Sequence, residues 1–251
     1  MRAVVAFFGL PRCSAVCWPS IERHLLAPLA TAASVTVVAH LYRQDRVVNP
    51  RSGEDAPLPE ANYRPFEAFR TQIEARPLDE PGLLASLKPY GDAWGDGHVS
   101  LVNLLLQLRS LHLATALAAA EAPDVVLFAR PDLQYHEPLA PAVIDHAASG
   151  AMHLGLPAWE AWGGLNDRFA LAGSGVYRAY GSRLLLAPHY CIQTGLPLHS
   201  ERFLAYAMRF AGAQVRTFDQ RASRVRVDGS LAEEDFEGRL SPLVRTGPPG
   251  P

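Results

Sequence analysis

The stretch AVVAFFGLPRCS, residues 3–14, decides the fold class of this protein. It opens with six apolar residues in a row and is then broken by Gly9 and Pro11. A short apolar run that stops at a turn is typical of a strand covered on both faces of a sheet. We therefore predict a buried first strand over residues 3–8, with the residues after it at its carboxyl end.

The next residues predict a helix and a second strand parallel to the first. Pro19 suits the first position of a helix, and apolar residues then recur on one helical face as far as Pro28. Ser34–His40 is rich in valine and predicts the second strand. A helix between parallel strands is a right-handed crossover, so this unit indicates a doubly wound α/β fold.

The rest of the chain extends this pattern into one Rossmann-like domain over residues 1–218, with a mostly parallel central sheet and helices on both faces. Residues 43–64 hold prolines and charges without a period, which predicts a long surface excursion of the kind that often serves as a lid. Further helices are expected at residues 81–87, 99–121, 141–148 and 199–211, and further strands at 124–129, 152–156 and, as the last strand, 214–218. Residues 219–251 form a charged extension that ends in prolines and glycine and is predicted to be partly disordered.

Composition excludes several classes of protein. The 251 residues are 49% hydrophobic, enough for one sizeable core. The chain has 23 Lys and Arg against 25 Asp and Glu, so no basic excess indicates a nucleic-acid partner. Cys13, Cys17 and Cys191 show no CxxC spacing, which argues against a zinc site and fits a reducing cytoplasm. The apolar stretch 99–117 holds too many polar residues for a membrane span, so we expect no transmembrane segment.

Two predicted strand ends carry the first candidate site residues, because ligands of open α/β sheets bind outside the carboxyl ends of the strands. At the first end, Gly9 allows close approach of the backbone and Arg12 offers forked donors to a phosphate. An ordinary turn with a solvated arginine explains this pair equally well. The motif lacks the lysine of a Walker loop and the glycines of a dinucleotide fingerprint.

The second end is Arg130-Pro131-Asp132, the strongest candidate in the sequence. Asp132 is a candidate ligand for a divalent cation that neutralises a leaving diphosphate, and Arg130 is able to do similar work without a metal. The alternative is a structural ion pair between the two residues within a turn.

The loop of residues 159–169 brings aromatic and polar groups together. Trp159 and Trp162 are suited to stack on a sugar face, beside Asn166 and Asp167 as partners for hydroxyl groups. The alternative is a loop in which Asp167 caps the next element and tryptophan belongs to the core.

A last polar group, His199-Ser200-Glu201, stands at the predicted start of a helix. Ser200 is a candidate cap and Glu201 suits the helix dipole, so structure explains much of this group. Glu201 is also a candidate general base toward an acceptor hydroxyl, and His199 a candidate contact for a metal or a phosphate.

Taken in order, these segments resemble a group of GT-A-like glycosyltransferases. The resemblance rests on Gly-x-Pro-Arg after the first strand, Gln107–Ser110 on a long helix, a strand that runs into Arg-Pro-Asp-Leu, and then Asn-Asp-Arg-Phe and His-Ser-Glu. It covers residues 4–218 and depends on the shared order and spacing of short motifs. The implied fold is of the GT-A type, and the implied activity is transfer of a sugar from a nucleotide-diphosphate donor to a hydroxyl-bearing acceptor, whether a small molecule, a glycan or a lipid-linked acceptor.

The resemblance also implies roles for the candidate residues. Gly9 and Arg12 would lie near the nucleotide, and Asp132 would take the place of the metal-binding Asp-x-Asp, with Mg or Mn as the cofactor. This sequence departs from that pattern because Arg130 occupies the first acidic position. Asn166 and Asp167 would contact the donor or acceptor sugar, and either Asp167 or Glu201 would be the base if configuration is inverted.

Two other classes of function fit parts of the sequence. Residues 8–14 also resemble the phosphate loop of sulfotransferases that use an adenosine phosphosulfate donor, although Ala15-Val16 replaces the hydroxyl residues of that loop. The missing acidic position is also compatible with a protein that binds nucleotide sugars without turnover.

Overall fold

The computed structural model describes residues 1–77 and 80–237 and confirms a mixed α/β fold with a mostly parallel sheet. Seven strands lie in the order β10-β8-β9-β6-β1-β2-β5. Their bounds are Gln214–Phe218 (β10), His153–Pro157 (β8), Ala170–Gly173 (β9), Val125–Ala129 (β6), Arg2–Gly9 (β1), Ser34–Arg43 (β2) and Arg70–Ala75 (β5). Only β9 runs antiparallel to its neighbours among these strands. The predicted first strand is the centre of the sheet's parallel half.

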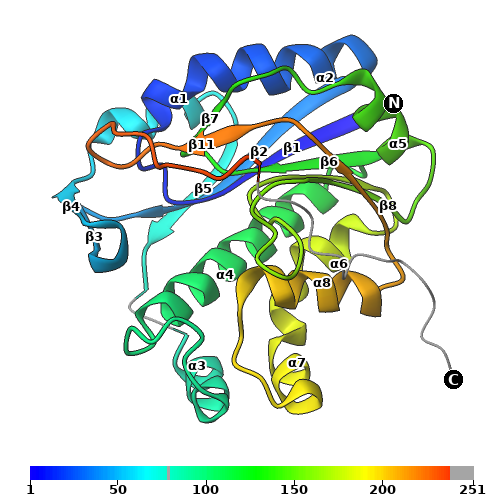
Figure 1. Ribbon diagram of the computed structural model, residues 1–251. Helices are drawn as coiled ribbons and strands as arrows, with labels where there is room; N and C mark the ends of the chain where they lie inside the picture. Colours follow the sequence, from blue (N-terminus) through cyan, green and yellow to red (C-terminus); the bar gives the residue numbers. More distant parts are fainter. Residues whose placement is uncertain (78–79, 238–251) are drawn as a thin grey trace, which may run out of the picture.

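Helices cover both faces of this sheet (Figure 1). One face holds α1 (Ser14–Ile21), α2 (Ala27–Ala32) and α5 (Pro141–Ala148); the other holds α4 (Val99–Ala119), α6 (Tyr177–Gly181), α7 (Ala187–Thr194) and α8 (Ser200–Phe210), with α3 (Pro81–Leu87) beside α4. Along β1, Val4 and Phe8 join the core on the α4 side, whereas Val5 and Phe7 join the core on the α1 side. Alternate side chains of a strand point to opposite faces, so the unbroken apolar run supplies both cores.

The first helix begins earlier than the sequence predicts. Helical structure starts at Ser14 rather than Pro19, and Pro19 lies inside α1. A π turn over Glu22–Leu26 joins α1 to α2, which carries Pro28. Proline has no N–H to donate to the helix, and wider turns of this kind accommodate such interruptions. The apolar residues Cys17, Ile21, Leu25 and Leu29 still form one stripe in the core, so the predicted helical face is correct.

Residues 43–75 contain more regular structure than the predicted excursion. They form an antiparallel hairpin of β3 (Arg46–Asn49) and β4 (Glu54–Pro57), followed by short 3-10 turns and the edge strand β5. The strand β5 escapes prediction because only Ile73 and Ala75 of its six residues are apolar. An edge strand exposed on one side needs no apolar run.

Residues 219–237 return across the molecule to the carboxyl ends of the strands. Within them, β11 (Ala222–Arg224) pairs antiparallel with β7 (Leu133–Tyr135), which directly follows Asp132. The strand at residues 214–218 is therefore not the last one. The predicted disorder at the C-terminal Pro-Gly residues falls outside the described residues.

The helix α4 has the length and composition of a membrane-spanning helix, and no other helix of the described residues does. In this fold its buried leucines pack on β1 and β2 as part of the core. It also carries a buried hydroxyl to the end of β1. The hydroxyl of Ser110 accepts a hydrogen bond from the backbone N–H of Gly9 at 2.8 Å and lies 2.8 Å from Nδ1 of His40.

We predict that Ser110→Ala lowers the free energy of unfolding by about 1–3 kcal/mol, because it leaves the N–H of half-buried Gly9 and the ring Nδ1 of buried His40 without their shared partner. Urea unfolding followed by circular dichroism measures this. Ser86→Ala is the control, since its exposed hydroxyl binds only a carbonyl of its own helix. Equal stability of the two variants would contradict the role given to Ser110.

Candidate functional site

A cavity of about 850 Å³ opens at the carboxyl ends of β1, β2 and β6. Eight of the nine residues singled out in the sequence line it: Gly9, Arg12, Arg130, Asp132, Trp162, Asp167, His199 and Glu201. Asn166 is the exception. Its buried amide donates to the carbonyl of Trp159 at 2.6 Å and accepts from the N–H of Arg168 at 2.8 Å, so it shapes the loop behind the cavity.

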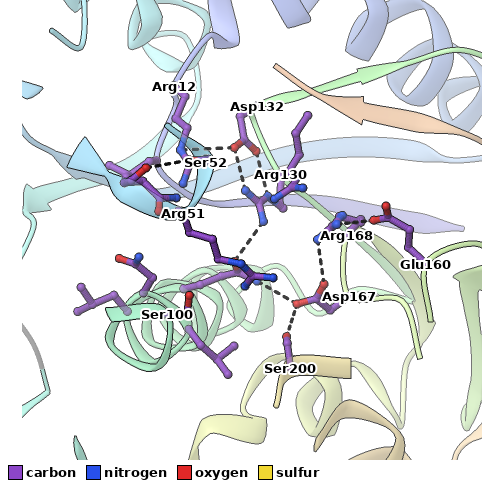
Figure 2. Close-up of a pocket in the computed structure, with 18 of the residues that line it drawn as sticks. Arg12, Arg51, Ser52, Ser100, Arg130, Asp132, Glu160, Asp167, Arg168 and Ser200 are labelled. Atoms are coloured by element: carbon purple, nitrogen blue, oxygen red, sulfur yellow. Dashed lines mark hydrogen bonds and ion pairs between the residues drawn. The ribbon is translucent and has the colours of Figure 1, made fainter. Parts of the chain in front are cut away.

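Arg130 and Asp132 form a two-point ion pair at the end of β6 (Figure 2). Nε of Arg130 lies 2.9 Å from Oδ1 of Asp132, and Nη2 lies 2.8 Å from Oδ2. Nε of Arg12 also lies near this pair, 3.9 Å from Oδ2 of Asp132. Burial alone would raise the pKa of Asp132, but the charges of Arg130 and Arg12 hold that pKa below its ordinary value. The structural ion pair considered from the sequence is therefore present, inside the cavity wall.

The side chain of Gln107 on α4 joins this pair to the second carboxylate, Asp167. Its Oε1 accepts from Nη1 of Arg130 at 3.1 Å, and its Nε2 donates to Oδ2 of Asp167 at 3.3 Å. A single amide supplies both the acceptor and the donor that this position needs. The polar groups on the two sides of the cavity thus belong to one hydrogen-bonded network.

Asp167 is buried and ionised. Burial would raise its pKa, but Arg168, whose Nη1 lies 3.7 Å from Oδ1, and the hydroxyl of Ser200 hold the pKa below its ordinary value. The hydroxyl of Ser200 donates directly to this carboxylate. The expected cap role of Ser200 is wrong, because α8 begins at Ser200 itself and His199 is the residue before it.

Glu201 faces the same cavity, in surroundings that favour the protonated form of its carboxyl group. Burial and the negative charge of Asp167 raise its pKa to about 8. Its Oε2 lies 3.3 Å from Nδ1 of His199, whose pKa is lowered, first by burial and then by Arg202. The ring of His199 stacks on Trp94, with centroids 5.3 Å apart. The pair is thus a neutral carboxyl beside a neutral imidazole, fixed by an aromatic neighbour.

The two tryptophans of the loop have different environments. Trp159 is 2% exposed and belongs to the core, whereas Trp162 is 59% exposed and lines the cavity. The core position considered from the sequence therefore holds for Trp159, and Trp162 remains a candidate for contact with a ligand. Trp162 keeps a face free for a ligand, as sugar stacking requires.

The residues around Asp132 do not fit a divalent cation. Both of its oxygens are held by a guanidinium, and a cation bound to either would lie within a few ångströms of two positive side chains. No group of three His, Cys, Asp or Glu side chains in the described part of the chain is placed to hold a metal ion. The guanidinium of Arg130 already supplies a positive charge to both oxygens of Asp132.

Several cavity residues escaped the sequence reasoning. Arg51, in the middle of the 3-10 turn after β3, and Arg76, directly after β5, lie where no motif marks them. Arg224 and Arg226 belong to the predicted C-terminal extension, and β11 brings them to the cavity. The only signal for them in the sequence was the charge of these segments.

Comparisons with known proteins leave the family open. No family model matches the chain, and no curated protein does. Among solved structures, the chain is similar to the galactosyltransferase LgtC in complex with donor and acceptor sugar analogs, at 13% identity and a TM-score of 0.47 over 86% of this chain and 73% of LgtC. It is also similar to an active-site mutant of LgtC, at 14% identity and a TM-score of 0.48 over 86% of this chain and 72% of that one.

The raised pKa of Glu201 predicts a pH dependence of stability. The folded state favours the protonated carboxyl, so stability falls as pH rises from the ordinary value of 4.5 towards 8. Neutral His199 has the opposite effect, but only below 6.5, so between pH 6.5 and 8 Glu201 acts without it. As the pH rises across this window, we expect the unfolding free energy of the wild type to fall more steeply than that of Glu201→Gln. The two slopes should differ by about 1 kcal/mol per pH unit. Urea midpoints across this window measure the difference, and parallel curves would contradict it.

Proposed function

We propose that this protein transfers a sugar from a nucleotide-diphosphate donor to a hydroxyl group of an acceptor. One observation carries the proposal: one cavity at the strand ends holds a cluster of arginines, the buried carboxylate of Asp167, which Gln107 joins to Arg130, and the buried carboxyl group of Glu201. Guanidinium groups suit the diphosphate of a donor, and carboxyl groups suit sugar hydroxyls and proton transfer. The motifs that resemble GT-A-like glycosyltransferases lie in the same cavity.

Glu201 is suited to accept a proton in this reaction. In the transfer, an acceptor oxygen bonds to the anomeric carbon, the bond from that carbon to the diphosphate oxygen breaks, and the diphosphate leaves with the electron pair. The proton of the acceptor hydroxyl then needs a base. A carboxylate with a pKa near 8 is a stronger base than an ordinary one, and the rate is greatest when the pKa of the base lies near the working pH. Asp167 suits binding better, since Arg168, Ser200 and Gln107 already occupy its oxygens.

A panel of donors tests the proposal. Thermal shift with nucleoside diphosphates, nucleotide sugars and an adenosine phosphosulfate donor measures which class stabilises the fold. Mass spectrometry of the bound donor incubated with candidate acceptors then detects transfer. We expect a nucleotide sugar to give the largest shift. A shift with the phosphosulfate alone would favour sulfate transfer, and binding without turnover across a broad acceptor panel would favour a protein that only binds nucleotide sugars.

We predict that Glu201→Gln lowers the rate of sugar transfer by about 100-fold or more, because the amide cannot accept a proton. Glutamine mimics the protonated side chain, so the donor dissociation constant stays within about twofold. Steady-state transfer and calorimetry measure the two effects. Glu67→Gln is the matched control, because Glu67 is an exposed carboxylate that does not line the cavity. Full transfer by Glu201→Gln would exclude Glu201 as the base.

A separate prediction concerns Trp162. Trp162→Ala removes the exposed ring that lines the cavity, and we expect it to weaken binding of the nucleotide sugar by about tenfold. Binding of the corresponding nucleoside diphosphate, which lacks the sugar, should change little. Calorimetric titration with both ligands separates the effects. An equal loss for both would place the ring against the nucleotide.

A further inference from the structure

Arginines without carboxylate partners gather on one side of the cavity. Arg51, Arg76 and Arg226 all line it, and among the described residues no Asp or Glu lies within ion-pair distance of them. By contrast, Arg130 pairs with Asp132, and Arg168 pairs with Glu160. Among the described residues, these three arginines therefore differ from Arg130 and Arg168 in having no carboxylate within ion-pair distance.

The arginines converge because two distant segments meet at the β3–β4 hairpin. Arg226 donates through Nη1 to the carbonyl of Ser52, next to Arg51 in the chain. The following N–H, of Val227, donates to Oε1 of Glu54 at 3.2 Å. Oε2 of Glu54 in turn binds Nη1 of Arg12 at 3.2 Å. The guanidinium groups of Arg12 and Arg226 are thus held beside the hairpin tip that carries Arg51.

Two further observations favour an anion as the ligand of these guanidinium groups. Nε of Arg12 is buried and has no hydrogen-bond partner, although its side chain lines the cavity. Arg76 is held at 2.8 Å from the amide oxygen of Asn103, and burial and then the nearby charge of Arg12 lower its pKa. Cations crowded in this way repel one another, and a polyanion between them would relieve that repulsion.

We propose that Arg12, Arg51, Arg76 and Arg226 bind the diphosphate of the ligand, and that this binding needs no divalent cation. The proposal rests on the proposed function for the identity of the ligand. Forked guanidinium donors match phosphate oxygens, and several of them neutralise the charge that a metal ion would otherwise balance. Asp132 then acts as a positioning residue, because it holds Arg130 and faces Arg12 rather than coordinating a metal.

Calorimetry with inorganic pyrophosphate tests the site directly. We expect the wild type to bind pyrophosphate in the presence of EDTA, and Mn²⁺ alone to give no saturable binding. Arg51→Gln, at an exposed residue whose loss spares the fold, should weaken pyrophosphate binding by about tenfold, and Arg51→Gln/Arg226→Gln by more. Arg23→Gln/Arg209→Gln is the control, because it removes the same charge from exposed residues outside the cavity.

Three outcomes would overturn the inference: no pyrophosphate binding in EDTA, binding that appears only with Mg²⁺ or Mn²⁺, or binding that the Arg51→Gln variant leaves unchanged. The same titration with nucleotide sugars separates this inference from the proposed function. Nucleotide sugars bound only in the presence of metal would overturn the metal-free site and leave sugar transfer standing. If pyrophosphate binds without metal and no nucleotide sugar binds at all, the metal-free site stands and the proposed sugar transfer is overturned.

Discussion

The two-point ion pair between Arg130 and Asp132 fixes the rest of the site. A buried charge is tolerated when an opposite charge and hydrogen bonds satisfy it, and here each member supplies the other's partner. Gln107 extends the constraint from Arg130 to Asp167 on the far side of the cavity. The long core helix that carries Gln107 therefore links the two carboxylates, Asp132 through Arg130 and Asp167 directly.

Much of the fold follows from the sequence, because a parallel sheet covered on both faces leaves long apolar runs. The runs at residues 3–8 and 124–129 correspond to the adjacent strands β1 and β6. Elements without such runs were missed. The edge strand β5 is mostly polar, and β9 consists of only four residues, Ala170–Gly173, inside a glycine-rich region. Pro19 misplaced the helix start because proline tolerance at a first turn does not exclude proline further along.

The candidate site was predicted where chemistry concentrates at strand ends, as with Asp132 and Arg130. It was missed where tertiary structure delivers a residue from elsewhere. Arg226 reaches the cavity only because β11 pairs with β7, and a pairing of two three-residue strands leaves almost no sequence pattern. The protonation state of Glu201 could not be predicted from the sequence either. The pKa of Glu201 depends on burial and on Asp167, which lies 34 residues earlier in the chain.

Residues 219–237 follow the last strand of the main sheet in the chain and return to the cavity. All seven strands of the main sheet end by Phe218, so the scaffold and the last part of the cavity wall are specified by separate stretches of chain. During synthesis, all seven strands of the main sheet are made before Arg226, whose guanidinium donates to the carbonyl of Ser52. A chain cut short after β10 would hold the seven strands of the main sheet but lose a cationic wall of the cavity, together with the buried side chains of Ala222, Val225 and Val227. The same short segment therefore completes both the site and the core on the α1 side.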